Sequence, residues 1–250
     1  MTLVTITNKF LDDVQWTSYS QCDFILDSDT HIFKIGINSN ANDLGSFAAI
    51  LNSEEIKRAG RYLHLHDKNR FIIARGAARL ILGKYLNIAP EAIAFEIGDN
   101  KKPFIKNSKL FYNISHSGNR IVLAVSLSAV GIDTEQINLD FDFQDIIAEY
   151  FSAEEASFIA ETDFANRFFR LWTRKEALTK ATGKGLDEDL KYIPALEGEH
   201  SIASELIGSA ADWVTSSFSL DAENIASVSA NVNCSRLVFF DGDFEAEQPG

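Results

Sequence analysis

Apolar residues follow two different periods along this chain. Three runs rich in Val, Ile, Leu and Phe are HIFKIGI (31–37), RIVLAVSL (120–127) and RLVFFDG (236–242). Such runs predict β-strands, whereas the segments between them repeat their apolar residues every three to four positions, as amphipathic helices do. The combined pattern predicts a mixed α/β protein.

Two helices are expected in the first half of the chain. One begins near Asp67, a residue type that caps helix N-termini well. Its apolar stripe consists of Ile73, Ala77, Leu80 and Ile81. A shorter helix is expected from Ser53, with Glu54 and Glu55 in the first turn, where carboxylates interact favourably with the helix dipole.

Two further helices are expected in the second half. Ser152 and Glu155 have the spacing of a capping box, so a helix should start there. The longest helical pattern, FANRFFRLWTRKEALTKAT, covers roughly residues 164–182. Gly183 follows it at the position that favours a left-handed C-cap.

The composition narrows the class of protein and its partners. The 250 residues are 46% hydrophobic, which is enough for one large core or two modest ones. No apolar run approaches the roughly 20 residues that span a bilayer, and MTLVTITNKFLDDVQW lacks the layout of a signal peptide, so we expect a soluble, cytoplasmic protein. Cys22 and Cys234 have no metal-binding or disulfide spacing and indicate reduced packing residues.

The net charge of −13 argues against a nucleic-acid partner, because binding to a phosphate backbone needs a positive surface. Any anionic ligand must therefore meet a local basic cluster.

Asp133 and Glu135 are candidates for a cation site. They lie two residues apart after an apolar run, so alternation along a strand places both carboxylates on one side. Magnesium prefers such oxygen ligands and keeps several waters. The same spacing is also common at solvated strand ends, and the pair alone leaves both interpretations open.

Glu176 and Lys180 lie four apart on the long predicted helix, so their side chains are neighbours. An ordinary surface ion pair would have the same spacing, but the apolar flanks Phe168, Phe169 and Leu171 favour a more specific role. A third segment has residues that can bind phosphate. Lys101 and Lys102 precede Pro103, and the string NISHSG (113–118) leads into a predicted strand. Lysines, hydroxyls and a histidine can all bind phosphate oxygens.

Three segments, in this order, resemble the Sfp-type 4′-phosphopantetheinyl transferases. They are KKPFI (101–105) with FYNISHSG (111–118), then GIDTE (131–135), then FFRLWTRKEALTKATGKGL (168–186). Weaker similarity extends over roughly residues 45 to 240. The resemblance implies magnesium-dependent transfer of the phosphopantetheine arm of coenzyme A to a serine of an acyl or peptidyl carrier protein, with release of 3′,5′-ADP.

The resemblance also implies roles for individual residues. Asp133, Glu135 and Glu176 would hold the magnesium ion. Glu176 would act as the base for the carrier serine or help to position it, and Lys180 would neutralise the departing 3′,5′-ADP. The remaining coenzyme A contacts implied are Arg58, Lys102, Lys175, Ser115 and His116. The string Asn100-Lys101-Lys102-Pro103 lacks the usual glycine before the Lys-Pro pair, so the phosphate contact could fall to Lys101 or to Lys102.

By the same resemblance, the fold is an α/β fold of the α+β type with two similar subdomains, 1–127 and 128–250, related by a pseudo-twofold axis. Coenzyme A would bind between them, and the working form would be a monomer. The carrier could belong to fatty-acid, polyketide or nonribosomal-peptide synthesis. Two rival functions are a non-catalytic coenzyme A-binding module and a magnesium-dependent phosphodiesterase.

Overall fold

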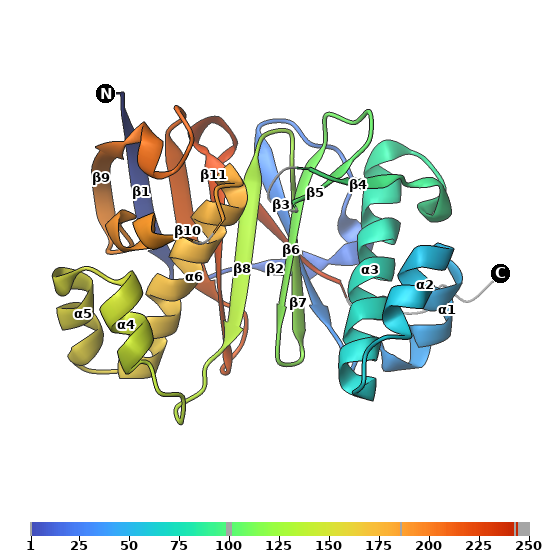
Figure 1. The fold of residues 1–250 in the computed structure, drawn as a ribbon. Helices are drawn as coiled ribbons and strands as arrows, with labels where there is room; N and C mark the ends of the chain where they lie inside the picture. The colour runs from blue at the N-terminus through green and yellow to red at the C-terminus, as the bar shows by residue number, and fades with distance from the viewer. Residues whose placement is uncertain (1, 99–101, 186, 243, 245–250) are drawn as a thin grey trace.

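Two five-stranded sheets, each covered by its own layer of helices, form the body of the protein (Figure 1). The computed structural model describes residues 2–98, 102–185, 187–242 and 244. In the order in which the strands lie side by side, the first sheet contains β8 (Val130–Gln136), β11 (Asn224–Asn231), β10 (Trp213–Ser219), β1 (Leu3–Leu11) and β9 (Gly198–Ala203). The second contains β2 (Trp16–Ser18), β12 (Arg236–Asp241), β3 (Asp29–Gly36), β7 (Arg120–Ser126) and β6 (Phe111–Ser117).

The helices are divided between the two sheets. The second sheet carries α1 (Leu44–Ala49), α2 (Ser53–Ala59) and α3 (Leu65–Leu86), with the small β4 (Phe95–Ile97) and β5 (Pro103–Ile105) pair beside them. The first sheet carries α4 (Gln144–Tyr150), α5 (Ala153–Ala160) and α6 (Phe164–Thr182). Within the described residues, none of these helices combines the length and apolarity needed to span a membrane.

The two halves repeat one arrangement, as the predicted pseudo-twofold fold requires. In the N-terminal half β3 is followed by three helices and then by β6 and β7; in the C-terminal half β8 is followed by three helices and then by β10 and β11. The strand orders β3-β7-β6 and β8-β11-β10 match. Capping boxes start α2 at Asn52 and Glu55 and α5 at Ser152 and Glu155, so equivalent residues lie 100 positions apart.

The sheets exchange strands at the chain ends. The N-terminal β1 pairs with β9 and β10 of the C-terminal half, and the C-terminal β12 pairs with β2 and β3 of the N-terminal half. The predicted division into 1–127 and 128–250 therefore does not follow the sheets at either terminus. Strands that are distant in sequence pair only when the whole chain folds. A local sequence pattern therefore does not predict this pairing.

The helix predictions hold in three places and shift in one. The longest helix, α6, covers Phe164–Thr182, and Gly183 is left-handed with a φ of 77°. The helices expected from Ser53 and after Ser152 are α2 and α5. However, α3 begins at Leu65, and Asp67 lies inside its first turn in an ion pair with Arg70 at 2.8 Å.

Close packing between α6 and β8 depends on Gly131. A Cβ atom at this position would lie 2.1 Å from the Ala177 carbonyl oxygen and 2.3 Å from the Ala181 nitrogen, both backbone atoms. We expect Gly131→Ala to lower the free energy of unfolding by about 1–3 kcal/mol or more, because overpacking forces the helix to move. Thermal unfolding measures this. The matched control is Gly45→Ala in α1, where nothing lies within 4 Å of the added atom; an equal loss there would contradict the steric argument.

Candidate active site

Alternation along β8 points two carboxylates at α6. Val130 and Ile132 face the opposite sheet and pack in the core between the two sheets. Gly131 and Asp133 face α6, and Glu135 continues the same face one pleat further on. Asp133 is buried, with 3% of its surface exposed, and Glu135 is half-buried.

The long helix brings Glu176 and Lys180 to these carboxylates. Lys180 Nζ lies 2.5 Å from Asp133 Oδ1 and 3.6 Å from Glu176 Oε2. The predicted pair of residues four apart is therefore not a surface decoration: the Glu176 side chain is 16% exposed and that of Lys180 is 30% exposed. Two acidic side chains therefore contact one ammonium group, and Glu135 interacts with it electrostatically.

The NISHSG strand closes the site from the other sheet. The edge of β6 lies along the edge of β8, and side chains join them: Ser115 Oγ donates to Asp133 Oδ1 at 2.9 Å, and Ser117 Oγ donates to Glu135 Oε2 at 2.8 Å. Asn113 Oδ1 accepts a hydrogen bond from the backbone nitrogen of β8 at Ile132. Asn113, Ser115 and Ser117 lie two positions apart on β6 and therefore share one face. For this reason all three can form hydrogen bonds with β8.

Burial and mutual repulsion shift the ionisation of these groups. Burial, with Asp133 and Glu176 nearby, raises the pKa of Glu135 to about 7, against the opposing effects of Ser117 and Lys180. Burial and Asp133 also raise the pKa of Glu176, although Lys180 opposes them. Burial lowers the pKa of Lys180, but its carboxylate neighbours outweigh burial and raise it overall. An excess of buried negative charge of this kind is typical of a cation site.

The donor set fits magnesium. Asp133 Oδ2 is buried and has no hydrogen-bond partner among the described residues, so one lone-pair direction is left for a ligand. Oxygen is the ligand atom that Mg²⁺ prefers. Within the described part of the chain, no three Asp, Glu, His or Cys side chains form a ready-made metal cage, and a magnesium site that shares its shell with water and substrate phosphate does not need one.

Two lysines expected at coenzyme A are engaged elsewhere. Lys102 Nζ donates to the carbonyls of Val130, Lys180 and Ala181, at 3.3, 2.5 and 3.0 Å, and thereby caps the C-terminal end of α6. Burial lowers the pKa of Lys102 to about 8. Its phosphate contact stays a prediction that would require it to leave these carbonyls. Its alternative, Lys101, lies outside the described residues.

Lys175 points away from the site. The side chain is fully buried on the far side of α6 and pairs with Glu155 at 3.0 Å. Burial lowers the pKa of Lys175, and Glu155 opposes that shift. A direct phosphate contact by Lys175 gains no support from this position.

Basic residues of α2 and α3 lie near His116, and one of them, Arg70, was missed by the sequence analysis. His116 lies on β6, where partial desolvation, Arg70 and Lys180 lower its pKa. Arg70 thus lies close to the site from the first turns of α3, and Arg58 stacks over Phe71 at 5.0 Å just beside it. The spacing of Asp67 and Arg70 on one helix was visible in the sequence, but only the fold brings Arg70 towards His116.

Three carboxylates and a lysine, all at least partly shielded from solvent, thus lie at the seam between two similar halves. The sequence model of the 4′-phosphopantetheinyl transferase superfamily matches residues 129–229, and that of the N-terminal part of 4′-phosphopantetheinyl transferase matches residues 38–128. The chain belongs to the 4′-phosphopantetheinyl transferase superfamily and is an enzyme of this class.

Individual relatives agree with this assignment. The chain is 32% identical to the 4′-phosphopantetheinyl transferase HetI of Nostoc sp. over 170 residues, 65% of this chain and 72% of the relative. It is 34% identical to the transferase psf-1 of Bacillus pumilus over 67% of this chain and 73% of the relative. It is 27% identical to the transferase Sfp of Bacillus subtilis over 64% of this chain and 73% of the relative.

Proposed function

We propose that this enzyme moves the 4′-phosphopantetheine group of coenzyme A to a serine of an acyl or peptidyl carrier protein and that it requires Mg²⁺. The observation that carries the proposal is the convergence of Asp133, Glu135 and Glu176 on Lys180 at the seam between the two sheets. Ser115 of the other sheet joins these four residues through Asp133, whereas Lys102 and Lys175 contact other parts of the protein.

The residues suit the bond changes of this transfer. The serine oxygen forms a bond to the β-phosphorus of coenzyme A while the bond from that phosphorus to the 3′,5′-ADP oxygen breaks. Asp133, Glu135 and Glu176 would hold Mg²⁺, which when bound supplies positive charge to the pyrophosphate. Glu176, whose pKa is raised, accepts the serine proton or orients its acceptor. Lys180 donates to the leaving phosphate and stabilises the charge that develops there.

A local basic segment supports the coenzyme A part of the proposal. The chain carries −13 overall, yet residues 57–70 contain five Lys or Arg and one Asp. This segment covers the end of α2 and the start of α3 and includes Arg58 and Arg70. Guanidinium groups bind phosphates with directed hydrogen bonds, so coenzyme A can meet positive charge here despite the global field. Ser115 and His116 would contact the 3′-phosphate region.

Carrier modification is the test of this function. The wild-type enzyme is incubated with an apo carrier protein, coenzyme A and Mg²⁺, and the carrier is weighed by mass spectrometry. We expect the carrier to gain the mass of phosphopantetheine. A protein that binds coenzyme A without changing the carrier would be a non-catalytic module, and cleavage of coenzyme A without transfer would indicate a phosphodiesterase; either outcome overturns the proposal. A panel of carriers then identifies the pathway served.

A further inference from the structure

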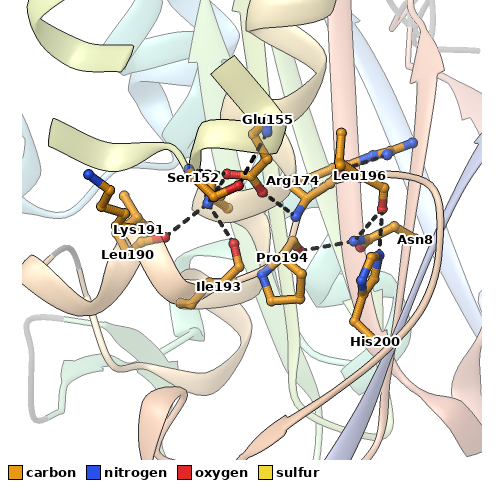
Figure 2. Close-up of polar contacts among 12 residues, drawn as sticks. Asn8, Ser152, Glu155, Arg174, Leu190, Lys191, Ile193, Pro194, Leu196 and His200 are labelled. Carbon is orange, nitrogen blue, oxygen red and sulfur yellow. Dashed lines mark hydrogen bonds and ion pairs between the residues drawn. The ribbon is translucent and has the colours of Figure 1, made fainter. Parts of the chain in front are cut away.

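The side of α6 that faces away from the active site contains a buried ion pair. Lys175 Nζ, which is fully buried, contacts Glu155 Oε2 at 3.0 Å and donates to the carbonyls of Leu190 and Ile193 at 3.0 and 2.5 Å. Glu155 is the third residue of α5 and also accepts from the backbone nitrogens of Ser152 and Ala195 (Figure 2). One lysine thus joins α6 to the start of α5 and to the segment that follows α6 in the chain.

The neighbouring residue reinforces the attachment. Arg174 donates to Ser217 Oγ of β10 at 2.7 Å and to the Ala195 carbonyl at 2.8 Å, and it pairs with Glu197 at 2.5 Å. Thr173, one residue earlier, shares a hydrogen bond with Ser227 of β11 at 2.8 Å. Three consecutive side chains of α6 are therefore held by directional bonds, and the fourth is Glu176.

We infer that Glu155 and Lys175 are positioning residues, which fix the rotation of α6 about its own axis and thereby aim Glu176 and Lys180 at the carboxylates of β8. This inference rests on the proposed function of those residues. Apolar packing under α6 is non-directional and limits its rotation only weakly. Charge-assisted hydrogen bonds to three separate segments limit it strongly.

The geometry shows how much a small rotation matters. With side chains, a helix has a radius of about 5–6 Å, so a rotation of about 10° moves the end of a side chain by roughly 1 Å. A misplacement of about 1 Å can cost roughly 100-fold in rate. Consecutive residues leave a helix about 100° apart, so the bonds of Lys175 determine where the Glu176 carboxylate lies without touching it.

The N-terminal half contains the same device without a catalytic neighbour. Glu55, the third residue of α2, pairs with Arg75 of α3 at 2.5 Å. This pair corresponds to Glu155 and Lys175, and in both pairs the partners are 20 residues apart in the sequence. The position after Arg75 is Gly76, which packs against Phe47. The first pair therefore serves as a matched control, since it stabilises a similar helix junction but aims no carboxylate.

The experiment compares Glu155→Gln/Lys175→Met with Glu55→Gln/Arg75→Met. Glu155→Gln/Lys175→Met removes both charges of its pair, so that no buried charge is left unpaired there. In the control, Arg79 also loses its carboxylate partner Glu55, 2.9 Å away, but keeps its hydrogen bonds to the carbonyls of Pro90 and Ile93. Folding is checked by circular dichroism and thermal unfolding. Binding of Mn²⁺, a paramagnetic substitute for Mg²⁺, is titrated by electron paramagnetic resonance in the presence of coenzyme A, and kcat is measured with a carrier protein.

We expect both variants to lose thermal stability. Only Glu155→Gln/Lys175→Met should raise the Mn²⁺ dissociation constant, by about 10-fold, and lower kcat by about 10- to 100-fold, whereas the control should keep its Mn²⁺ affinity. Lys175→Arg, with the residue type of position 75, should keep most of the wild-type affinity. If the first double variant does not fold, Lys175→Met alone takes its place with the same expectation, because Glu155 keeps its hydrogen bonds from the backbone nitrogens of Ser152 and Ala195.

Two failures are distinguishable. Wild-type protein that binds no Mn²⁺ in the presence of coenzyme A would overturn the proposed metal site itself, and the inference with it. Wild-type binding together with unchanged Mn²⁺ affinity and kcat in a folded Glu155→Gln/Lys175→Met protein would overturn the positioning role alone.

Discussion

Replacing Asp133 with asparagine is expected to lower kcat for carrier modification by roughly 1,000-fold or more. The proposed magnesium site has only about three protein carboxylates, and Asp133 is the most buried of them, with an unpartnered Oδ2. A bound metal contributes several kcal/mol of charge stabilisation, and each 1.36 kcal/mol is tenfold in rate. The asparagine amide oxygen can still accept the hydrogen bond from Ser115. The loss of kcat therefore measures mainly the removed charge and metal ligand and not a change in side-chain shape.

Carrier modification at saturating coenzyme A and Mg²⁺ measures this effect, with circular dichroism to confirm the fold. The control is Glu96→Gln, which removes one carboxylate from the exposed pair with Lys106 and should leave kcat unchanged. An Asp133→Asn enzyme that works at a near wild-type rate would show that the carboxylates of β8 do not hold the metal.

Replacing Lys180 with alanine is expected to lower kcat by about 100- to 1,000-fold, with a smaller effect on the KM for coenzyme A. An interaction that strengthens as charge develops on the leaving group acts on turnover more than on ground-state binding. Steady-state kinetics with coenzyme A varied separates the two constants. A change confined to KM would make Lys180 a phosphate clamp and remove it from the chemical step.

The same variant should also change stability in a way that depends on the metal. Without Lys180, the buried Asp133 side chain keeps its hydrogen bond from Ser115 but repels Glu176 and Glu135. Removing one partner of a buried pair costs about 3–5 kcal/mol, to be discounted here because the Lys180 side chain is 30% exposed.

Because a ligand that binds only the folded state stabilises it, we expect Mg²⁺ to raise the unfolding temperature of Lys180→Ala more than that of the wild type. Differential scanning calorimetry with and without Mg²⁺ measures this difference. Lys106→Ala, from an exposed pair, should show no such metal dependence.

Local patterns in the sequence determined the elements that carry the site. The helix over 164–182 and its glycine stop follow from periodicity and from the left-handed C-cap, and both capping boxes can be read from four residues. Alternation alone places Asp133 and Glu135 on one face of a strand. These features depend on interactions within one or two turns or pleats, so a short stretch of sequence contains all the information they need.

Only the tertiary structure decided what the charged side chains meet. It directed Lys175 to Glu155 and Lys102 to the end of α6, although both stand beside residues of the recognised motifs. It also brought Arg70 towards His116 and exchanged β1 and β12 between the two sheets. The partner of a long charged side chain depends on which distant segment packs within a few ångströms of it. Neither the secondary-structure propensity nor the hydrophobic periodicity of a short stretch determines that packing.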